Sequence, residues 1–243
     1  MGILDQLREE AEQKKSSEQL ALDLEAQRKQ NYETRILPKM QQIFKYLQEL
    51  VEHLNYLEVP VQVENYTTRF SKLGTLAQKN YKISSDDFGG FADMDKLMQI
   101  NLTFLCVGEG EFEYKISGKQ AIENEIAYLH AKRLTVKTKN LLIAHNNETT
   151  RFIVKRSIPV RFRFAVDYDN SVIKVIINNN GNFSTYTELW QAEDINEQFL
   201  DEIACYLLRK DTKFIKPAIS DEQREVLRKK LAVIKNVERQ DRG

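Results

Sequence analysis

The stretch from Thr149 to Trp190 restricts the possible folds of this chain more than any other. Between residues 158 and 168 every even position is apolar or aromatic, whereas the odd positions include Arg161, Arg163 and Asp167. This period of two is typical of a β-strand with one buried face. Turns are then expected at Asp169-Asn170 and at Asn180-Gly181, a dipeptide that tolerates two positive φ angles. The sequence therefore predicts an antiparallel meander whose apolar face must be covered.

The flanking segments add further strands and the helices that could cover the sheet. Strands are predicted at 61–70, 78–84, 97–107, 111–117, 134–143 and 149–156. The link Gly108-Glu109-Gly110 predicts a tight hairpin. Helices are predicted from Lys119 to Arg133, after the Asp-x-x-Glu pattern that begins at Asp194, and after Pro217. The expected class is α+β: an antiparallel, meander-type sheet covered by helices, with an N-terminal helical arm or coiled-coil-like hairpin and a C-terminal helix.

The N-terminal region contains the clearest helical periodicity. Leu4 to Tyr32 is rich in helix-forming residues but has a thin apolar stripe, and Pro38 predicts a helix start or kink near Leu37. Apolar residues then alternate at spacings of four and three, as in a heptad repeat. This candidate self-association seam comprises Ile36, Met40, Ile43, Leu47, Leu50, Leu54 and Leu57. The seam either packs on the protein's own sheet or joins two chains as a coiled coil.

These patterns suggest three segments: a helical segment over residues 1–58, an antiparallel α+β domain over 59–216 and a C-terminal helix over 217–243. Shifting the chain by sixty positions aligns two alternating stretches, each followed by a helix. An internal duplication of 61–133 and 134–210 is therefore a further hypothesis.

Composition points to a cytoplasmic protein without a membrane partner. The chain has 36 basic and 36 acidic residues, so its net charge favours neither a membrane nor a nucleic acid. No apolar run approaches the roughly 20 residues of a membrane span, and the first thirty residues are too charged for a signal peptide. Cys106 and Cys205 fall on apolar faces, where we expect small buried side chains and no redox chemistry.

The sequence contains no recognisable catalytic or metal-binding motif, so it favours a non-enzymatic protein without a cofactor. The triplet Asp87-Phe88-Gly89 lacks the other kinase motifs and is interpreted as a turn, or alternatively as a lid over a site. The three histidines, His53, His130 and His145, stand too far apart along the chain for a metal motif. There is also no Walker loop and no nucleophile elbow.

One local imbalance of charge suggests a binding face. Ten basic and three acidic residues lie between Lys132 and Lys174. The candidate anion- or partner-binding face comprises Arg151, Lys155, Arg156, Arg161, Arg163 and Lys174. Arginine presents a planar fork that matches phosphate and carboxylate groups. Alternatively, the six acids between Glu188 and Glu202 neutralise this face within the chain or across a dimer.

Two functional hypotheses follow. The first is a non-enzymatic interaction or ligand-holding module that binds itself or another protein through its N-terminal helices. The second is binding of a nucleotide or nucleic acid on the basic sheet face, although the balanced net charge disfavours nucleic acid. No known family is indicated by these residues.

Overall fold

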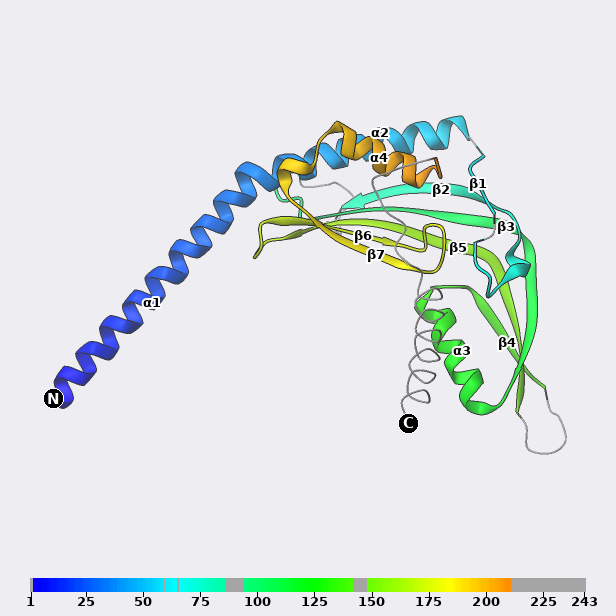
Figure 1. The fold of residues 1–243 in the computed structure, drawn as a ribbon, viewed down its shortest axis with the longest axis horizontal. Helices are drawn as coiled ribbons and strands as arrows, with labels where there is room; N and C mark the ends of the chain where they lie inside the picture. Colours follow the sequence, from blue (N-terminus) through cyan, green and yellow to red (C-terminus); the bar gives the residue numbers. More distant parts are fainter. Residues whose placement is uncertain (1, 59, 65, 86–93, 142–147, 211–243) are drawn as a thin grey trace, which may run out of the picture.

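The computed structural model describes residues 2–58, 60–64, 66–85, 94–141 and 148–210. They form a curled antiparallel sheet with helices on both sides and a long N-terminal helix that projects away from it (Figure 1). The helices are α1 (Ile3–Asn31), α2 (Leu37–Leu57), α3 (Lys119–Ala131) and α4 (Glu197–Leu207). The strands are β1 (Gln62–Val63), β2 (Leu76–Ser85), β3 (Gln99–Ser117), β4 (Val136–Leu141), β5 (Thr149–Asp167), β6 (Val172–Asn178) and β7 (Thr185–Trp190). The predicted α+β class with an antiparallel sheet is confirmed.

Strand β5 organises the sheet, whose order is β1-β2-β3-β5-β6-β7 with β4 also paired to β5. Along one edge β5 pairs with β3 over nearly its whole length. Its other edge pairs with β4 over residues 149–154 and with β6 over 161–167. Between these two ladders lies Pro159, whose register partner on the first edge is Leu105 of β3. It has no N–H to donate and therefore suits a position that has no ladder partner on the second edge.

The predicted hairpin at Gly108-Glu109-Gly110 is wrong. The segments before and after it belong to one strand, β3, because both pair with β5: Val107 lies opposite Ser157, and Glu111 lies opposite Lys155. Gly108–Gly110 therefore form a bulge in a continuous ladder. Likewise, β5 is one strand where two were predicted. A bulge bends the strand that contains it, and Figure 1 shows β3 and β5 curving together.

The predicted break near Leu37 takes the form of a π-helical turn, Tyr32–Ile36, which joins α1 to α2. Pro38 follows it in the first turn of α2, where its missing N–H is tolerated. The chain stays helical through this turn and changes direction there, so it forms a bent arm and no hairpin (Figure 1).

The heptad seam packs on the chain's own sheet. Its residues Ile36, Met40, Ile43, Leu47 and Leu54 are buried in the core, Leu50 is half-buried against it, and Leu57 is exposed. The same core takes in the apolar face of α4, and α2 and α4 lie together on one side of the sheet, opposite α3 (Figure 1). Burial of this stripe is the main reason that α2 is stable as a helix.

Two further predictions differ in detail. The strand predicted at 61–70 is restricted to β1, because the chain then turns so that Tyr66 packs on Phe183, with ring centroids 5.1 Å apart. Helix α4 is capped by Asn196, whose side-chain oxygen accepts the N–H of Phe199 at 2.9 Å; Asp194 instead lies in a short 3-10 helix.

The turn after β6 is longer than the predicted two-residue turn, with positive φ at Asn179 and Gly181. The Asp87-Phe88-Gly89 turn and the helix predicted after Pro217 lie outside the described residues. Among the described helices, none has both the length and the apolar content of a membrane span. Within the same residues, no group of three His, Cys, Asp or Glu side chains is arranged to hold a metal ion.

Candidate functional site

The basic residues singled out from the sequence occupy different environments. Arg151 forms an ion pair with Glu113, to which its Nε donates at 2.7 Å. Arg156 donates hydrogen bonds to three backbone carbonyl oxygens, those of Leu73, Thr75 and Glu109. The guanidinium groups of both arginines are therefore occupied by contacts within the chain. Lys155 is exposed, and Lys174 is half-buried on β6.

Arg161 and Arg163 lie two residues apart on β5, so their side chains leave the sheet on the same face. This is the open face, opposite the one covered by α2 and α4. Nε and Nη2 of Arg161 donate to the side-chain oxygen of Asn101, at 3.0 and 2.5 Å. The Nε of Arg163 is buried and has no hydrogen-bond partner among the described residues.

Arg161 lines a pocket of about 400 Å³ between the open face and the C-terminal end of α3. Three more cations line it: Lys82 from β2, and Lys132 and Arg133 from the end of α3. Uncharged polar residues are also in the lining, among them Asn80, Thr103, Asn178 and Thr185. We call this site the basic pocket and define it by eight of its lining residues: Asn80, Lys82, Thr103, Lys132, Arg133, Arg161, Asn178 and Thr185.

A bulge in β2 turns Lys82 toward this pocket. Asn80 and Tyr81 together oppose a single residue of β3, and Asn80 adopts a left-handed φ of 62°. The extra residue reverses the alternation, so Tyr81 is buried and Lys82 lies on the open face. The side chain of Asn55 in α2 bonds both backbone groups of Tyr81: its Nδ2 donates to the carbonyl, and its Oδ1 accepts the N–H.

No pattern in the sequence predicts this convergence of cations. Lys132 and Arg133 belong to the basic stretch recognised above, but only the fold brings the end of α3 over the sheet. Lys82 lies outside that stretch, and the reversal of its side chain by the bulge has no signature in the alternation of β2. Arg161 is therefore the one member of the basic pocket that was also a sequence candidate.

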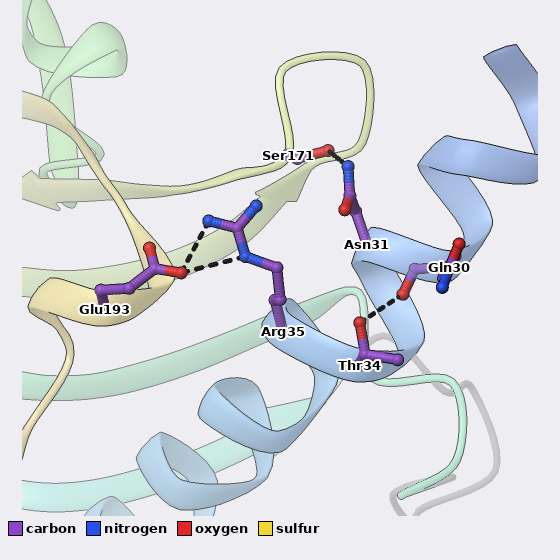
Figure 2. Close-up of polar contacts among 6 residues, drawn as sticks. All are labelled: Gln30, Asn31, Thr34, Arg35, Ser171 and Glu193. Atoms are coloured by element: carbon purple, nitrogen blue, oxygen red, sulfur yellow. Dashed lines mark hydrogen bonds and ion pairs between the residues drawn. The ribbon is translucent and has the colours of Figure 1, made fainter.

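The second candidate site is the helical arm α1 and its junction with the body. Around the π-helical turn, Asn31 donates to the Ser171 hydroxyl at 3.4 Å, and Arg35 donates to Glu193 at 2.6 and 3.0 Å (Figure 2). One turn earlier, Arg28 pairs with Asp169 at 3.0 Å. These contacts fix the last turns of α1 to the β5–β6 turn and to the segment before α4.

Beyond this junction, α1 has little contact with the body. Every described side chain from Ile3 to Gln27 is exposed, including Leu20 at 62% and Leu24 at 46%. The arm has a few weak contacts of its own, such as the Lys14–Glu18 ion pair at 3.9 Å. Exposed large apolar side chains on such a projecting element are a feature of interaction surfaces.

Comparison of the chain with protein-family models, with curated proteins and with solved structures gave no match in any of the three.

Proposed function

We propose that this protein is a non-enzymatic, cytoplasmic interaction module that self-associates through α1 and whose sheet domain holds a ligand. The observation that carries the proposal is the exposed arm. An isolated helix of this kind is marginal in water, because most helical stability in proteins comes from packing of an apolar face. The body covers only the last turns of α1, so a partner would supply the missing packing.

The sequence of α1 favours a second copy of the chain as that partner. A heptad-spaced stripe runs along the helix through Ile3, Leu7, Glu10, Lys14, Ser17, Ala21 and Leu24. In an antiparallel pair centred on Glu12, Glu10 of one chain stands opposite Lys14 of the other. The N-terminal end of the stripe in one chain then faces the C-terminal end of the stripe in the other, so Ile3 lies opposite Ala21 of the second chain. Parallel pairing would instead place like charges together.

Charge exchange tests this arrangement in the full-length protein. We expect the wild type to dimerise in sedimentation equilibrium, and two variants to stay monomeric: Glu10→Lys and Lys14→Glu. An equimolar mixture of the two variants should regain the dimer, because each supplies the charges that the other lacks. Glu123→Lys, an exposed change on α3, is the control and should not alter the wild-type mass.

A deletion of the arm is informative only if it removes residues of α1 and leaves the π-helical turn and α2 in place. Truncation at Pro60 would also delete α2, whose buried seam belongs to the core, and would unfold the body. A wild type that stays monomeric at all accessible concentrations would contradict self-association. The partner of α1 would then have to be another protein.

A further inference from the structure

We propose that the basic pocket binds the phosphate group of a small, hydroxylated molecule. This site is independent of the arm. The argument rests on the sheet register, on the end of α3, on the uncompensated charge of the pocket and on its size.

The floor of the pocket is one row of side chains that crosses five strands. Directly paired residues of an antiparallel sheet face the same side. Here each residue of the row pairs with the next one across the sheet. Lys82 pairs with Thr103, Thr103 with Arg161, Arg161 with Asn178, and Asn178 with Thr185. Neighbouring strands lie about 4.8 Å apart, so Lys82 and Arg161 begin roughly 10 Å apart, within reach of one shared oxyanion.

The end of α3 brings Arg133 to this row. Its N–H bonds the carbonyl of His130 at 2.9 Å, the N–H of Leu134 bonds that of Leu129 at 2.9 Å, and Arg133 has a φ of 56°. This is a Schellman motif, whose left-handed residue is usually glycine. Glycine would be less strained here, yet the position carries a long cationic side chain that lines the pocket.

The charge of the pocket has no counterpart in its lining. All four charged residues that line it are basic, and none of them forms an ion pair with a described residue. Lys132 donates to the carbonyl of Phe183 at 2.5 Å, which leaves its charge uncompensated. Burial lowers the pKa of Arg161, and the nearby charges of Arg133 and Arg163 lower it further. An anion between these groups would relieve their mutual repulsion and gain charge-assisted hydrogen bonds.

The remaining lining indicates what the phosphate is attached to. A volume of about 400 Å³ is in the range of small-molecule sites. Asn80, Thr103, Asn178 and Thr185 offer amide and hydroxyl groups that suit the hydroxyls of a sugar or polyol. The one aromatic residue of the lining, Phe104, is 2% exposed, and its ring packs on Tyr81 and Phe162. The pocket therefore lacks a stacking platform for the bases of a nucleic-acid strand.

Calorimetric titration of the full-length protein tests the proposal. The probes are pyrophosphate, glucose 6-phosphate, unphosphorylated glucose and a single-stranded RNA 12-mer, each at low and high salt. We expect one saturable site for the phosphorylated probes, weakened by salt, and no binding of glucose. Arg161→Gln should weaken phosphate binding roughly 10- to 100-fold, the effect of losing a charge-assisted hydrogen bond.

A second variant separates binding from folding. Arg133→Gly should also weaken phosphate binding roughly tenfold, while the thermal midpoint stays unchanged or rises, because glycine suits the left-handed position. Glu58→Gly is the matched control: Glu58 has a φ of 47° at the end of α2 and does not line the pocket. It should leave binding intact.

Three results would overturn the inference. One is the absence of binding by either phosphorylated probe at low salt. Another is binding that Arg161→Gln and Arg133→Gly leave unchanged. The third is RNA binding that pyrophosphate displaces and that Arg161→Gln abolishes, which would make the pocket part of a nucleic-acid surface and not a small-molecule site.

Discussion

The guanidinium of Arg156 fills the space that a side chain at Gly108 would occupy. A Cβ added to Gly108 would lie 2.9 Å from Cδ2 of Leu76 and 3.0 Å from both Nε and Cζ of Arg156, and one added to Gly74 would lie 2.8 Å from Nη2. The arginine donates from this slot to the carbonyl oxygens of Leu73, Thr75 and Glu109. One cation thereby connects the segment before β2, the bulge of β3 and the middle of β5. We infer that this contact holds the bend of the sheet.

Gly108→Ala should therefore destabilise the protein by about 1–3 kcal/mol, because the methyl group presses on Leu76 and displaces Arg156 from its carbonyl partners. Denaturant unfolding followed by circular dichroism measures this cost. Gly110→Ala is the control: a Cβ there meets open space, and only the φ of 73° opposes it, for about 1 kcal/mol. Equal losses of unfolding free energy for the two variants would show that the packing of Arg156 against Gly108 does not contribute to stability.

The role of Arg156 shows where sequence analysis of this chain reaches its limit. Alternation at single strands correctly predicts which face of β5 is buried, because that pattern is local. The pairing of β3 with β5 on both sides of the bulge depends on residues far apart along the chain, so local patterns predict a turn at the glycines 108 and 110. Arg156 is assigned to a binding face only because it is an arginine. Its actual partners are carbonyl groups of residues 47 to 83 positions away, which local patterns do not identify.

The candidate pocket was harder to predict for a related reason. Its floor is a row across strands, and no two neighbours in that row are close in sequence except Asn178 and Thr185. Lys82 reaches it only because the β2 bulge reverses the alternation, and that bulge is held by Asn55 from α2. Charge density along the chain identified Arg161, whereas convergence of the other cations required the fold.

The heptad seam gives a prediction that distinguishes its buried and exposed positions. Ile43 is fully buried in the core, and Leu57 is 61% exposed. Ile43→Ala should cost about 2–5 kcal/mol of unfolding free energy, through lost burial and the cavity left behind. Leu57→Ala should change it by less than about 0.5 kcal/mol. A comparable loss at both positions, measured by denaturant unfolding, would mean that Leu57 is also covered, for example by a second chain.

Glu125 in α3 is a buried carboxylate whose loss should be costly. It is 4% exposed, accepts the Tyr114 hydroxyl at 2.6 Å and pairs with Arg69. Burial, and then this hydrogen bond, raise the pKa of Tyr114, so the phenol remains a donor at neutral pH.

We expect Glu125→Gln to reduce the unfolding free energy by about 1–3 kcal/mol, because the neutral amide no longer compensates the charge of Arg69, which is partly exposed and lies over the rings of Phe70 and Tyr128. The exposed Glu123 on the same helix supplies the control, and Glu123→Gln should be close to neutral. If both variants unfold at the same denaturant concentration as the wild type, the contacts of Glu125 with Tyr114 and Arg69 have no role in attaching α3 to the sheet.

The two cysteines should differ in reactivity. Cys106 is fully buried, and burial raises the pKa of its thiol to about 11, whereas Cys205 is partly accessible. Because the thiolate is the reactive form, iodoacetamide at pH 8 should modify Cys205 in the native protein and Cys106 only after unfolding. Mass spectrometry of the two peptides measures this order. Rapid modification of Cys106 in native protein would contradict its burial.

The same shift predicts a loss of stability in alkali. The pKa of Cys106 is higher in the folded state than the value of about 9 expected when unfolded, so its contribution is complete below pH 9. Between about pH 9 and pH 11 the unfolded thiol ionises first, which favours unfolding. The difference in unfolding free energy between wild type and Cys106→Ala should therefore shrink over this range, because the contribution of the buried thiol is lost. A constant difference between the two unfolding curves from pH 8 to pH 11 would mean that Cys106 ionises as easily in the fold as outside it.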